Sequence, residues 1–250
     1  KSTNGGGNLG VISVGVVHVD QHAIAFDPTN PNIIYFGTDG GVYKTTNGGA
    51  SFINCNNGFV TTQFYPGFAN AYDDSTIAIG GLQDNGTLKY SGGGYWGNLL
   101  GADGGFCAID PNNHDIMYYE TQWLQLYKTT NGGWSASYNV NGLPTGSGNT
   151  NFIAPFVIAP SNSNILYAGS RNVYKTTDGA NSWFSSNGQT SLNGTNIACI
   201  GVAFTNADTL IAATGTGAFG VTPVFEIFAS VNGGQLWTNV TNHLNGNQNL

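Results

Sequence analysis

Charged side chains are scarce in this chain. Only 8% of its 250 residues are charged, six residues are lysine or arginine, and the formal net charge is −7. Binding to nucleic acid requires clustered basic residues that neutralise phosphates, and docking on anionic membranes requires similar clusters. The chain also lacks an apolar run of about 18 residues, the length of a membrane-spanning helix. We therefore expect no nucleic-acid partner and no membrane insertion.

Cysteine is also rare, because Cys55, Cys107 and Cys199 are the only three and are widely spaced. An odd number at this spacing fits neither a disulfide framework nor a cysteine-based zinc site, so lone or buried thiols are expected. The first residues, KSTNGGGNLG, lack the charged and apolar segments of a signal peptide. An export signal is therefore expected to lie upstream or to have been removed.

Helical signals are missing, because no stretch of ten or more residues combines helical periodicity with capping residues. Glycine, in contrast, occurs 38 times, and hydrophobic residues make up 40% of the chain. This composition is typical of a folded chain with frequent turns, and the length suits one all-β domain.

A turn motif recurs four times along the chain. Its copies begin at Thr45, Thr129, Thr176 and Ser230, so successive copies are 84, 47 and 54 residues apart. Because 84 is twice 42, the first interval contains a further unit, whose degenerate turn we place within residues 77–96. Self-similarity at this period is the mark of a repeat architecture.

Each unit follows one pattern: an apolar strand, a turn that often contains proline, a second strand, a short loop, a strand ending in Tyr-Lys-Thr-Thr, and a closing strand. Four short strands in about 42 to 54 residues are typical of a β-propeller blade. We therefore predict an all-β fold, a β-propeller of four-stranded antiparallel blades that spans residues 1–250 as one propeller or as part of a larger ring. The predicted units are residues 18–54, 70–98, 107–138, 156–185 and 202–238.

The recurring turns resemble the Asp box of BNR repeats, Ser/Thr-x-Asp-x-Gly-x-Thr/Ser-Trp/Phe. TTDGANSW, residues 176–183, departs from it only at Ala180, and the other copies carry asparagine in place of aspartate. The Asp or Asn side chain accepts local backbone N–H groups, glycine takes a left-handed backbone, and the aromatic residue packs between strands. The resemblance implies a structural role for these residues: Thr45, Asn47, Gly49, Phe52, Thr129, Asn131, Gly133, Thr176, Asp178, Trp183, Ser230, Asn232, Gly234 and Trp237.

Two branches of Asp-box propellers are similar to this chain. DPTNPNIIYFGTDGGVYKTTNGGASF, residues 27–52, resembles a blade opening of the xyloglucan-active glucanases. HVDQH at residues 18–22 and GGLQDNGT at residues 80–87 resemble segments of secreted bacterial BNR-repeat proteins. Sialidases also carry Asp boxes, but they grip a substrate carboxylate with an arginine cluster. Arg171 is the only arginine here, which excludes that activity.

Asp39 and Asp103 are the candidate catalytic residues. Each follows an apolar strand and precedes two glycines, and glycoside hydrolysis requires two carboxyl groups that flank the scissile bond. By resemblance, Asp39 matches one catalytic aspartate of the glucanases and Asp103 the setting of the second. In that family the two lie in different propeller domains, whereas here they are 64 residues apart. The alternative is that both are turn residues beside glycine.

A polar cluster is expected to line the propeller channel. His18, Asp20 and His22 alternate along one expected strand, which would place their side chains on one face, and Asp84 is either a turn residue or a further member. Histidine and aspartate can ligate transition metals, but no further ligands are identifiable. We therefore predict neither a metal nor a cofactor.

Four aromatic residues lie outside the box positions, namely Tyr65, Tyr95, Trp96 and Trp123. Sugar rings stack on exposed aromatic side chains, so these four are candidates for sugar binding. The alternative is that they pack between blades.

The sequence favours a secreted or cell-surface propeller without catalytic activity, part of a larger extracellular protein that binds carbohydrate or protein. One alternative is a glycoside hydrolase that acts on a β-glucan such as xyloglucan, with Asp39 and Asp103 as its acid and base. Another is a self-assembling subunit of an extracellular filament or surface layer. Catalysis is left open by the sequence.

Overall fold

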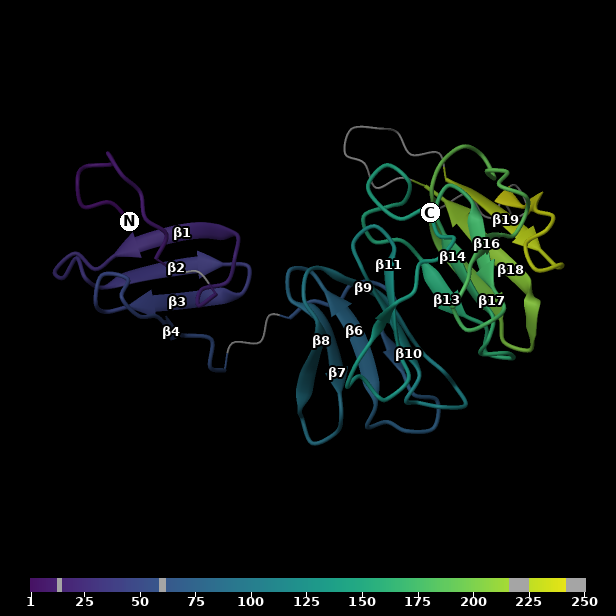
Figure 1. The fold of residues 1–250 in the computed structure, drawn as a ribbon, viewed down its shortest axis with the longest axis horizontal. Helices are drawn as coiled ribbons and strands as arrows, with labels where there is room; N and C mark the ends of the chain where they lie inside the picture. Colours follow the sequence, from purple (N-terminus) through teal and green to yellow (C-terminus); the bar gives the residue numbers. More distant parts are fainter. Residues whose placement is uncertain (13–14, 59–61, 216–224, 242–250) are drawn as a thin grey trace. The chain divides into compact units, whose positions relative to one another are not determined.

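The computed structural model describes residues 1–12, 15–58, 62–215 and 225–241, which form five four-stranded antiparallel sheets (Figure 1). The described residues contain no α-helix, and none of them forms a helix able to cross a membrane. Within each sheet the strands are hydrogen-bonded in chain order. The predicted propeller of four-stranded blades is confirmed.

The five sheets are called the first to fifth blades. The first blade contains β1 (Gln21–Phe26), β2 (Ile34–Thr38), β3 (Gly41–Thr45) and β4 (Ile53–Asn54). The second contains β5 (Ala69–Asn70), β6 (Ala78–Leu82), β7 (Gly86–Tyr90) and β8 (Trp96–Leu100). The third contains β9 (Gly104–Ile109), β10 (Met117–Thr121), β11 (Gln125–Thr129) and β12 (Ser137–Tyr138). The fourth contains β13 (Phe156–Ile158), β14 (Leu166–Gly169), β15 (Val173–Thr176) and β16 (Phe184–Ser185). The fifth contains β17 (Ile197–Ala203), β18 (Asn206–Thr214), β19 (Glu226–Ser230) and β20 (Thr238–Asn239).

The chain divides into two compact units, Lys1–Thr62 with the first blade and Gln63–Leu250 with the other four. Within the second unit the first strands of successive blades are neighbours, since β9 contacts both β5 and β13, and β13 also contacts β17. This arrangement places the first strand of each of these four blades innermost, as in a propeller.

Hydrophobic clusters join successive blades of the second unit. Between the third and fourth blades, Tyr118 and Leu126 pack against Phe156, Leu166 and Trp183. Similar clusters join the second blade to the third and the fourth to the fifth. Because one blade cannot bury both of its faces alone, this packing between neighbours supplies the core of the fold.

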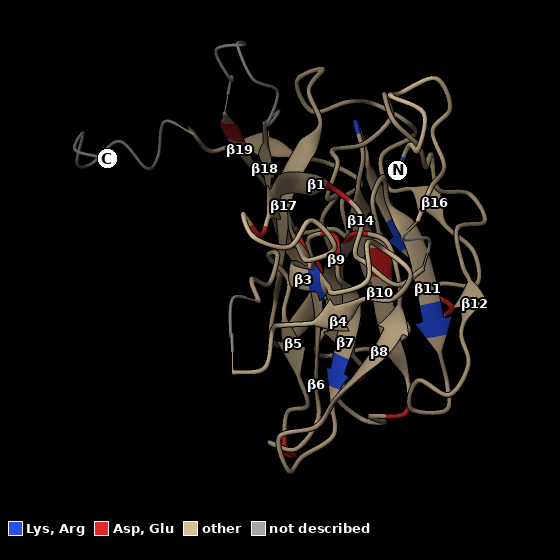
Figure 2. Cartoon of the chain, turned by 90° about the vertical axis from the view of Figure 1, so that its left-hand side faces the viewer, with Lys and Arg blue, Asp and Glu red and all other residues tan. Residues whose placement is uncertain are grey.

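A lysine on the third strand of a blade ties it to the box turn of the next blade. Lys89 Nζ donates to the carbonyl of Gly132 at 2.8 Å, and Lys128 Nζ donates to the carbonyl of Gly179 at 2.7 Å. Lys128 also lies over the ring of its cross-strand neighbour Tyr118, 5.6 Å from the centroid. The lysine at this strand position in the second and third blades thus connects each of them to the next blade, and the few basic residues lie mainly on strands (Figure 2).

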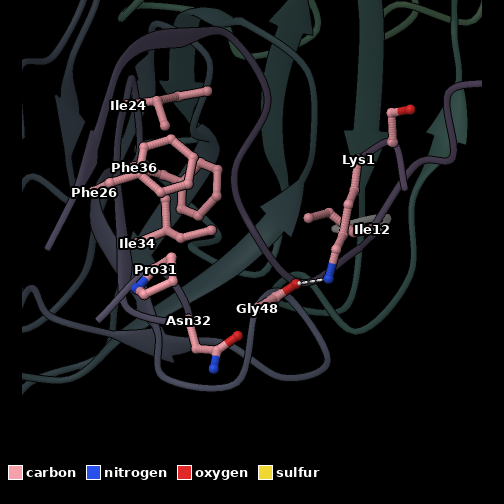
Figure 3. A pocket seen from close by; sticks show the side chains of 10 residues that line it. Lys1, Ile12, Ile24, Phe26, Pro31, Asn32, Ile34, Phe36 and Gly48 are labelled. Carbon is pink, nitrogen blue, oxygen red and sulfur yellow. Dashed lines mark hydrogen bonds between the residues drawn. The ribbon is translucent and has the colours of Figure 1, made fainter. Parts of the chain in front are cut away.

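The first unit contains an apolar cavity of about 490 Å³ (Figure 3). Ile24, Phe26, Ile34 and Phe36 form one wall, and Lys1 donates to the carbonyl of Gly48 at 2.8 Å. The strand register matches these wall residues to four residues of the fourth blade that pack against the third: Phe156, Ile158, Leu166 and Ala168. The cavity wall is therefore the blade face used for packing, and it presents no side chains suited to catalysis.

Candidate functional site

The box turns follow the third strand of each blade and are closed by their own side chains. In the fourth blade, Asp178 Oδ1 accepts the backbone N–H groups of Asn181 and Ser182, both at 3.0 Å. The Ser182 hydroxyl, followed by further hydrogen bonds of the turn, lowers the pKa of Asp178 to about 2. Thr176 Oγ1 donates to Asp178 at 2.7 Å and accepts the N–H of Ala180 at 3.1 Å. Asp178 is thus occupied within the turn.

The other three boxes share this geometry. The box hydroxyl donates to the Asn side chain at 2.9 to 3.0 Å in the pairs Thr45 with Asn47, Thr129 with Asn131 and Ser230 with Asn232. The box glycines are left-handed, with φ of 92° at Gly49, 97° at Gly133 and 83° at Gly234. Phe52 packs edge-on against Phe36, with ring centroids 5.7 Å apart.

The candidate residues Asp39, Asp84, Asp103 and Trp123 lie at the opposite end of their blades from the boxes. Element order requires this, because a box follows the third strand whereas these residues lie in second-to-third-strand turns or just before a first strand. Loops at one end of a propeller are a common location for ligand sites, since a rigid scaffold positions them. We call this end the turn face of each blade.

Asp103 anchors the turn face of the second and third blades. Its Oδ1 accepts the backbone N–H of Asp84 at 2.8 Å, and its Oδ2 accepts Gln122 Nε2 at 2.9 Å. Asp84 lies in the β6–β7 turn with φ of 58°, and Gln122 lies in the β10–β11 turn. Asp103 is buried, so its carboxylate joins two turns with both oxygens occupied.

Tyr65 belongs to the same group in the second unit. Its backbone N–H donates to the carbonyl of Gly81 at 2.9 Å. Burial, and then the nearby charges of Asp103 and Asp84, raise the pKa of the Tyr65 hydroxyl. The structure therefore brings together three residues that the sequence singled out separately.

An aromatic pair stands beside this group. Trp123 and Phe152 meet edge to face, with ring centroids 5.1 Å apart and planes at 90°, and the backbone N–H of Trp123 donates to the backbone carbonyl of Phe152 at 2.8 Å. Trp123 and Leu124 both have left-handed backbones, with φ of 67° and 60°. Such conformations are costly for bulky residues and often occur at functional sites. Phe152 is 41% exposed and was missed by the sequence reasoning, because no motif surrounds it.

In the first unit, His22 Nε2 lies 2.5 Å from Asp39 Oδ1. The Asp39 side chain is 31% exposed, and a carboxylate oxygen of Asp20 lies within 4.8 Å of one of Asp39. The expected alternation of His18, Asp20 and His22 along one strand is wrong, because β1 begins only at Gln21 and Asp20 is left-handed with φ of 57°. His18 instead lies against Gly40, where any larger residue would collide with its ring.

The predicted catalytic pair and the predicted polar cluster are divided between the two units. Asp39, His18, Asp20 and His22 belong to the first unit, whereas Asp103 and Asp84 belong to the second. The pairing of Asp39 with Asp103 therefore stays a prediction.

Tyr95 and Trp96 lie at the box end of the second blade. Tyr95 is 69% exposed. Trp96 is part of an aromatic group, with its ring centroid 5.1 Å from Tyr90, 5.5 Å from Phe64 and 6.4 Å from Phe68. The turn between β7 and β8, residues 91–95, lacks the Asp or Asn of a box. It is the degenerate turn that the sequence predicted within residues 77–96.

No protein-family model matches this chain, and no curated protein matches it. Among solved structures, a GH74 enzyme from Niastella koreensis is 23% identical with a TM-score of 0.57, and it covers 88% of this chain. An ancestral GH74 enzyme is 20% identical with a TM-score of 0.60 and covers 90% of this chain. The GH74 xyloglucanase from Xanthomonas campestris is 18% identical with a TM-score of 0.53 and covers 87%.

The chain resembles the xyloglucanase-like BNR-repeat propellers. The likeness concerns the fold, because identities of this size say little about a site. The chain spans only 38%, 31% and 38% of the lengths of these three proteins.

Proposed function

We propose that this chain is a non-catalytic binding propeller that recognises carbohydrate on the turn face of its third and fourth blades. The observation that carries this proposal is the edge-to-face pair of Trp123 and Phe152, of which Phe152 is 41% exposed. Sugar rings present apolar C–H faces that pack on aromatic side chains. A pair fixed by its own backbone hydrogen bond loses little side-chain freedom on binding.

Neutral hydrogen-bonding groups accompany the pair. Gln122 adjoins Trp123 and is oriented by Asp103. Asn151 adjoins Phe152 and holds the backbone there, since its Nδ2 donates to the carbonyl of Ile197 at 3.1 Å and its Oδ1 accepts Asn196 Nδ2 at 3.2 Å. An aromatic surface beside a positioned amide such as that of Gln122 is the chemistry that a hydroxylated ligand requires.

The geometry of Asp103 supports binding rather than hydrolysis in this unit. A general acid or base must exchange a proton with the substrate. The two oxygens of Asp103 are instead occupied by Asp84 and Gln122, and the residue is buried. Its role in the proposal is to hold the turns that present the aromatic pair.

A secreted or cell-surface location is part of the proposal. The chain carries few charges, which suits a neutral polysaccharide, and a similar structure is titled a xyloglucanase. Xyloglucan and other plant β-glucans are therefore the first ligands to test.

The test is affinity electrophoresis of the full chain through gels that contain xyloglucan, other β-glucans or no polysaccharide. Wild type should be retarded by at least one polymer, and Phe152→Ala should lose that retardation. Trp134→Ala is the matched control, because Trp134 is 93% exposed but lies on the box turn of the third blade. Retardation of Phe152→Ala equal to that of wild type would refute the proposed site. Absence of wild-type retardation by every neutral polymer would refute the proposed function.

A glycoside hydrolase is the second candidate, and the contact between His22 and Asp39 favours it. A partly exposed carboxylate beside a histidine can take part in proton transfer. Release of reducing sugar from xyloglucan by wild type, lost in Asp39→Asn, would establish hydrolysis. Absence of release from every polymer in the panel would remove this candidate.

A further inference from the structure

We call the junction between two neighbouring blades a seam. The seam between the third and fourth blades is covered on its outer side by the segment that follows β12. After β12 the chain runs along the fourth blade, where the carbonyl of Asn141 accepts the N–H of Trp183 at 2.8 Å. The indole Nε1 of Trp183 donates to the carbonyl of Asn139 at 3.2 Å, and Leu143 packs into the same cluster. The box tryptophan is consequently buried.

In the part of the chain that the structure describes, the equivalent seam between the fourth and fifth blades is open. After β16 the chain turns at Gly188 and Gln189, which have left-handed backbones with φ of 68° and 67°. A pocket of about 310 Å³ lies between this turn and the fifth blade. Trp237, the counterpart of Trp183, is only partly buried, and its buried Nε1 has no hydrogen-bond partner among the described residues.

The box turn of the fifth blade departs from the others at this pocket. In the first and third blades a serine hydroxyl accepts the box Asn Nδ2 at 2.8 Å, and in the fourth Ser182 donates to Asp178 at 2.6 Å. The fifth blade has Leu236 at this position, 75% exposed and lining the pocket. Leu236 thus replaces the serine hydroxyl that closes the other box turns, and its side chain forms an apolar wall of the pocket.

The pocket lining combines apolar surface with neutral hydrogen-bonding groups. Leu192, Phe228, Leu236 and Trp237 provide the apolar part. The polar part comes from Asn187, Thr190, Ser191 and Gln235, and none of the described residues that line the pocket is charged. Pyranose rings require this combination, with C–H faces on an apolar wall and hydroxyls on amide and hydroxyl groups. The volume is at the lower end for small-molecule sites, which suits a single ring.

The polar rim is held in place before any ligand arrives. Asn187 Nδ2 donates to the carbonyl of Thr190 at 2.7 Å, and Gln189 N–H donates to Ser185 Oγ at 2.6 Å. A prearranged turn reduces the entropy lost on binding.

We propose that this seam pocket binds one neutral pyranose unit of a polysaccharide. It is a second sugar site, on the outer edge of the fourth and fifth blades. Only the class of its ligand, a carbohydrate, rests on the proposed function. A polysaccharide that engages both sites would be held more tightly than either site could hold it alone.

Calorimetric titration of the full chain with cellohexaose and with xyloglucan oligosaccharides tests this site. Wild type should bind two equivalents. Gln235→Ala and Leu236→Ser, which restores the serine of the other boxes, should each weaken one of the two sites by about tenfold or more. Trp134→Ala, at the position equivalent to Gln235 in the third-blade box, should leave both sites unchanged. Circular dichroism and the thermal midpoint of each variant show that the fold is retained.

The outcomes separate the seam pocket from the proposed function. Loss of one equivalent in both seam variants, with Phe152→Ala removing the other, supports both sites. Unchanged binding in both seam variants refutes the pocket while leaving the turn-face site in place. Binding that is lost in the seam variants but kept in Phe152→Ala supports the pocket and refutes the turn-face site. No binding by wild type refutes both.

Discussion

Replacement of Glu120 by glutamine should remove a specific pH dependence from the stability of the second unit. Glu120 lies on β10 and is fully buried, with Oε1 accepting the N–H of Phe106 at 3.1 Å. Its Oε2 has no hydrogen-bond partner among the described residues. Burial, which outweighs the opposing amides of Phe106 and Ala154, raises the pKa of Glu120 well above its usual value.

Glu120 also departs from the repeat. The strand register matches it to Gly37, Gly81, Gly169 and Ala213 in the other blades. Gly105 provides the space, because a side chain there would collide with the Glu120 carboxyl group. One blade thus buries an acid where the others bury almost no side chain.

The sign of the effect follows from the raised pKa. In the unfolded chain the glutamate ionises at a pH of about 4.3, whereas in the folded chain it stays protonated to higher pH. Between these two pKa values unfolding releases a proton, so the free energy of unfolding falls by about 1.4 kcal/mol per pH unit because of this one group. The loss levels off once pH exceeds the folded-state pKa.

The assay is urea denaturation of wild type and Glu120→Gln from pH 4 to pH 8, followed by tryptophan fluorescence. All five tryptophans lie in residues 63–250, so the signal reports on the second unit. The stability gained by the glutamine variant should grow with pH from a small value near pH 4. Glu120→Ala is the control, because it removes the same proton and adds a constant cavity cost of about 2 kcal/mol. A difference between wild type and the glutamine variant that stays constant across this range would refute the reasoning.

Three further predictions concern single contacts. Lys128→Met should lower the free energy of unfolding by about 1 to 3 kcal/mol, because Gly179 loses its charged donor; urea denaturation measures this, and an unchanged midpoint would contradict it. Asp103→Ala should weaken sugar binding on the turn face by at least tenfold while leaving the seam pocket intact, because the two turns it joins lose their anchor; titration of both sites decides the matter. Cys107 should react with a thiol reagent only after unfolding, because burial raises the pKa of its thiol. The exposed Cys55 and Cys199 should react at once. Rapid reaction of all three thiols in the native protein would contradict this prediction.

The blade architecture could be predicted from the sequence because residues close together in the chain specify it. A box turn is specified by a hydroxyl, an Asp or Asn and a glycine within a few residues, and four copies establish the period. Asp178 illustrates this, since the hydrogen bonds to its carboxylate come from Thr176, Asn181 and Ser182.

The candidate sites depend on information that is not local. Phe152 carries no motif, and its importance comes from Trp123, a partner on another blade. Glu120 lies in a strand whose sequence has no distinguishing motif. Only the strand register shows that the residues at the same position of the other blades are glycine or alanine. His18 and Asp20 fit an alternating pattern, yet a left-handed residue ends it before β1. The open seam at Trp237 arises from the path of the chain after β16, which no residue pattern specifies.

Sugar recognition by the turn face is tested by the dissociation constant of a xyloglucan oligosaccharide, measured by calorimetry for wild type, Phe152→Ala and Trp134→Ala. Carbohydrate recognition by the turn face predicts that Phe152→Ala weakens one binding event by at least tenfold while Trp134→Ala matches wild type. Equal constants for all three proteins, or loss of binding only in Trp134→Ala, would contradict the account.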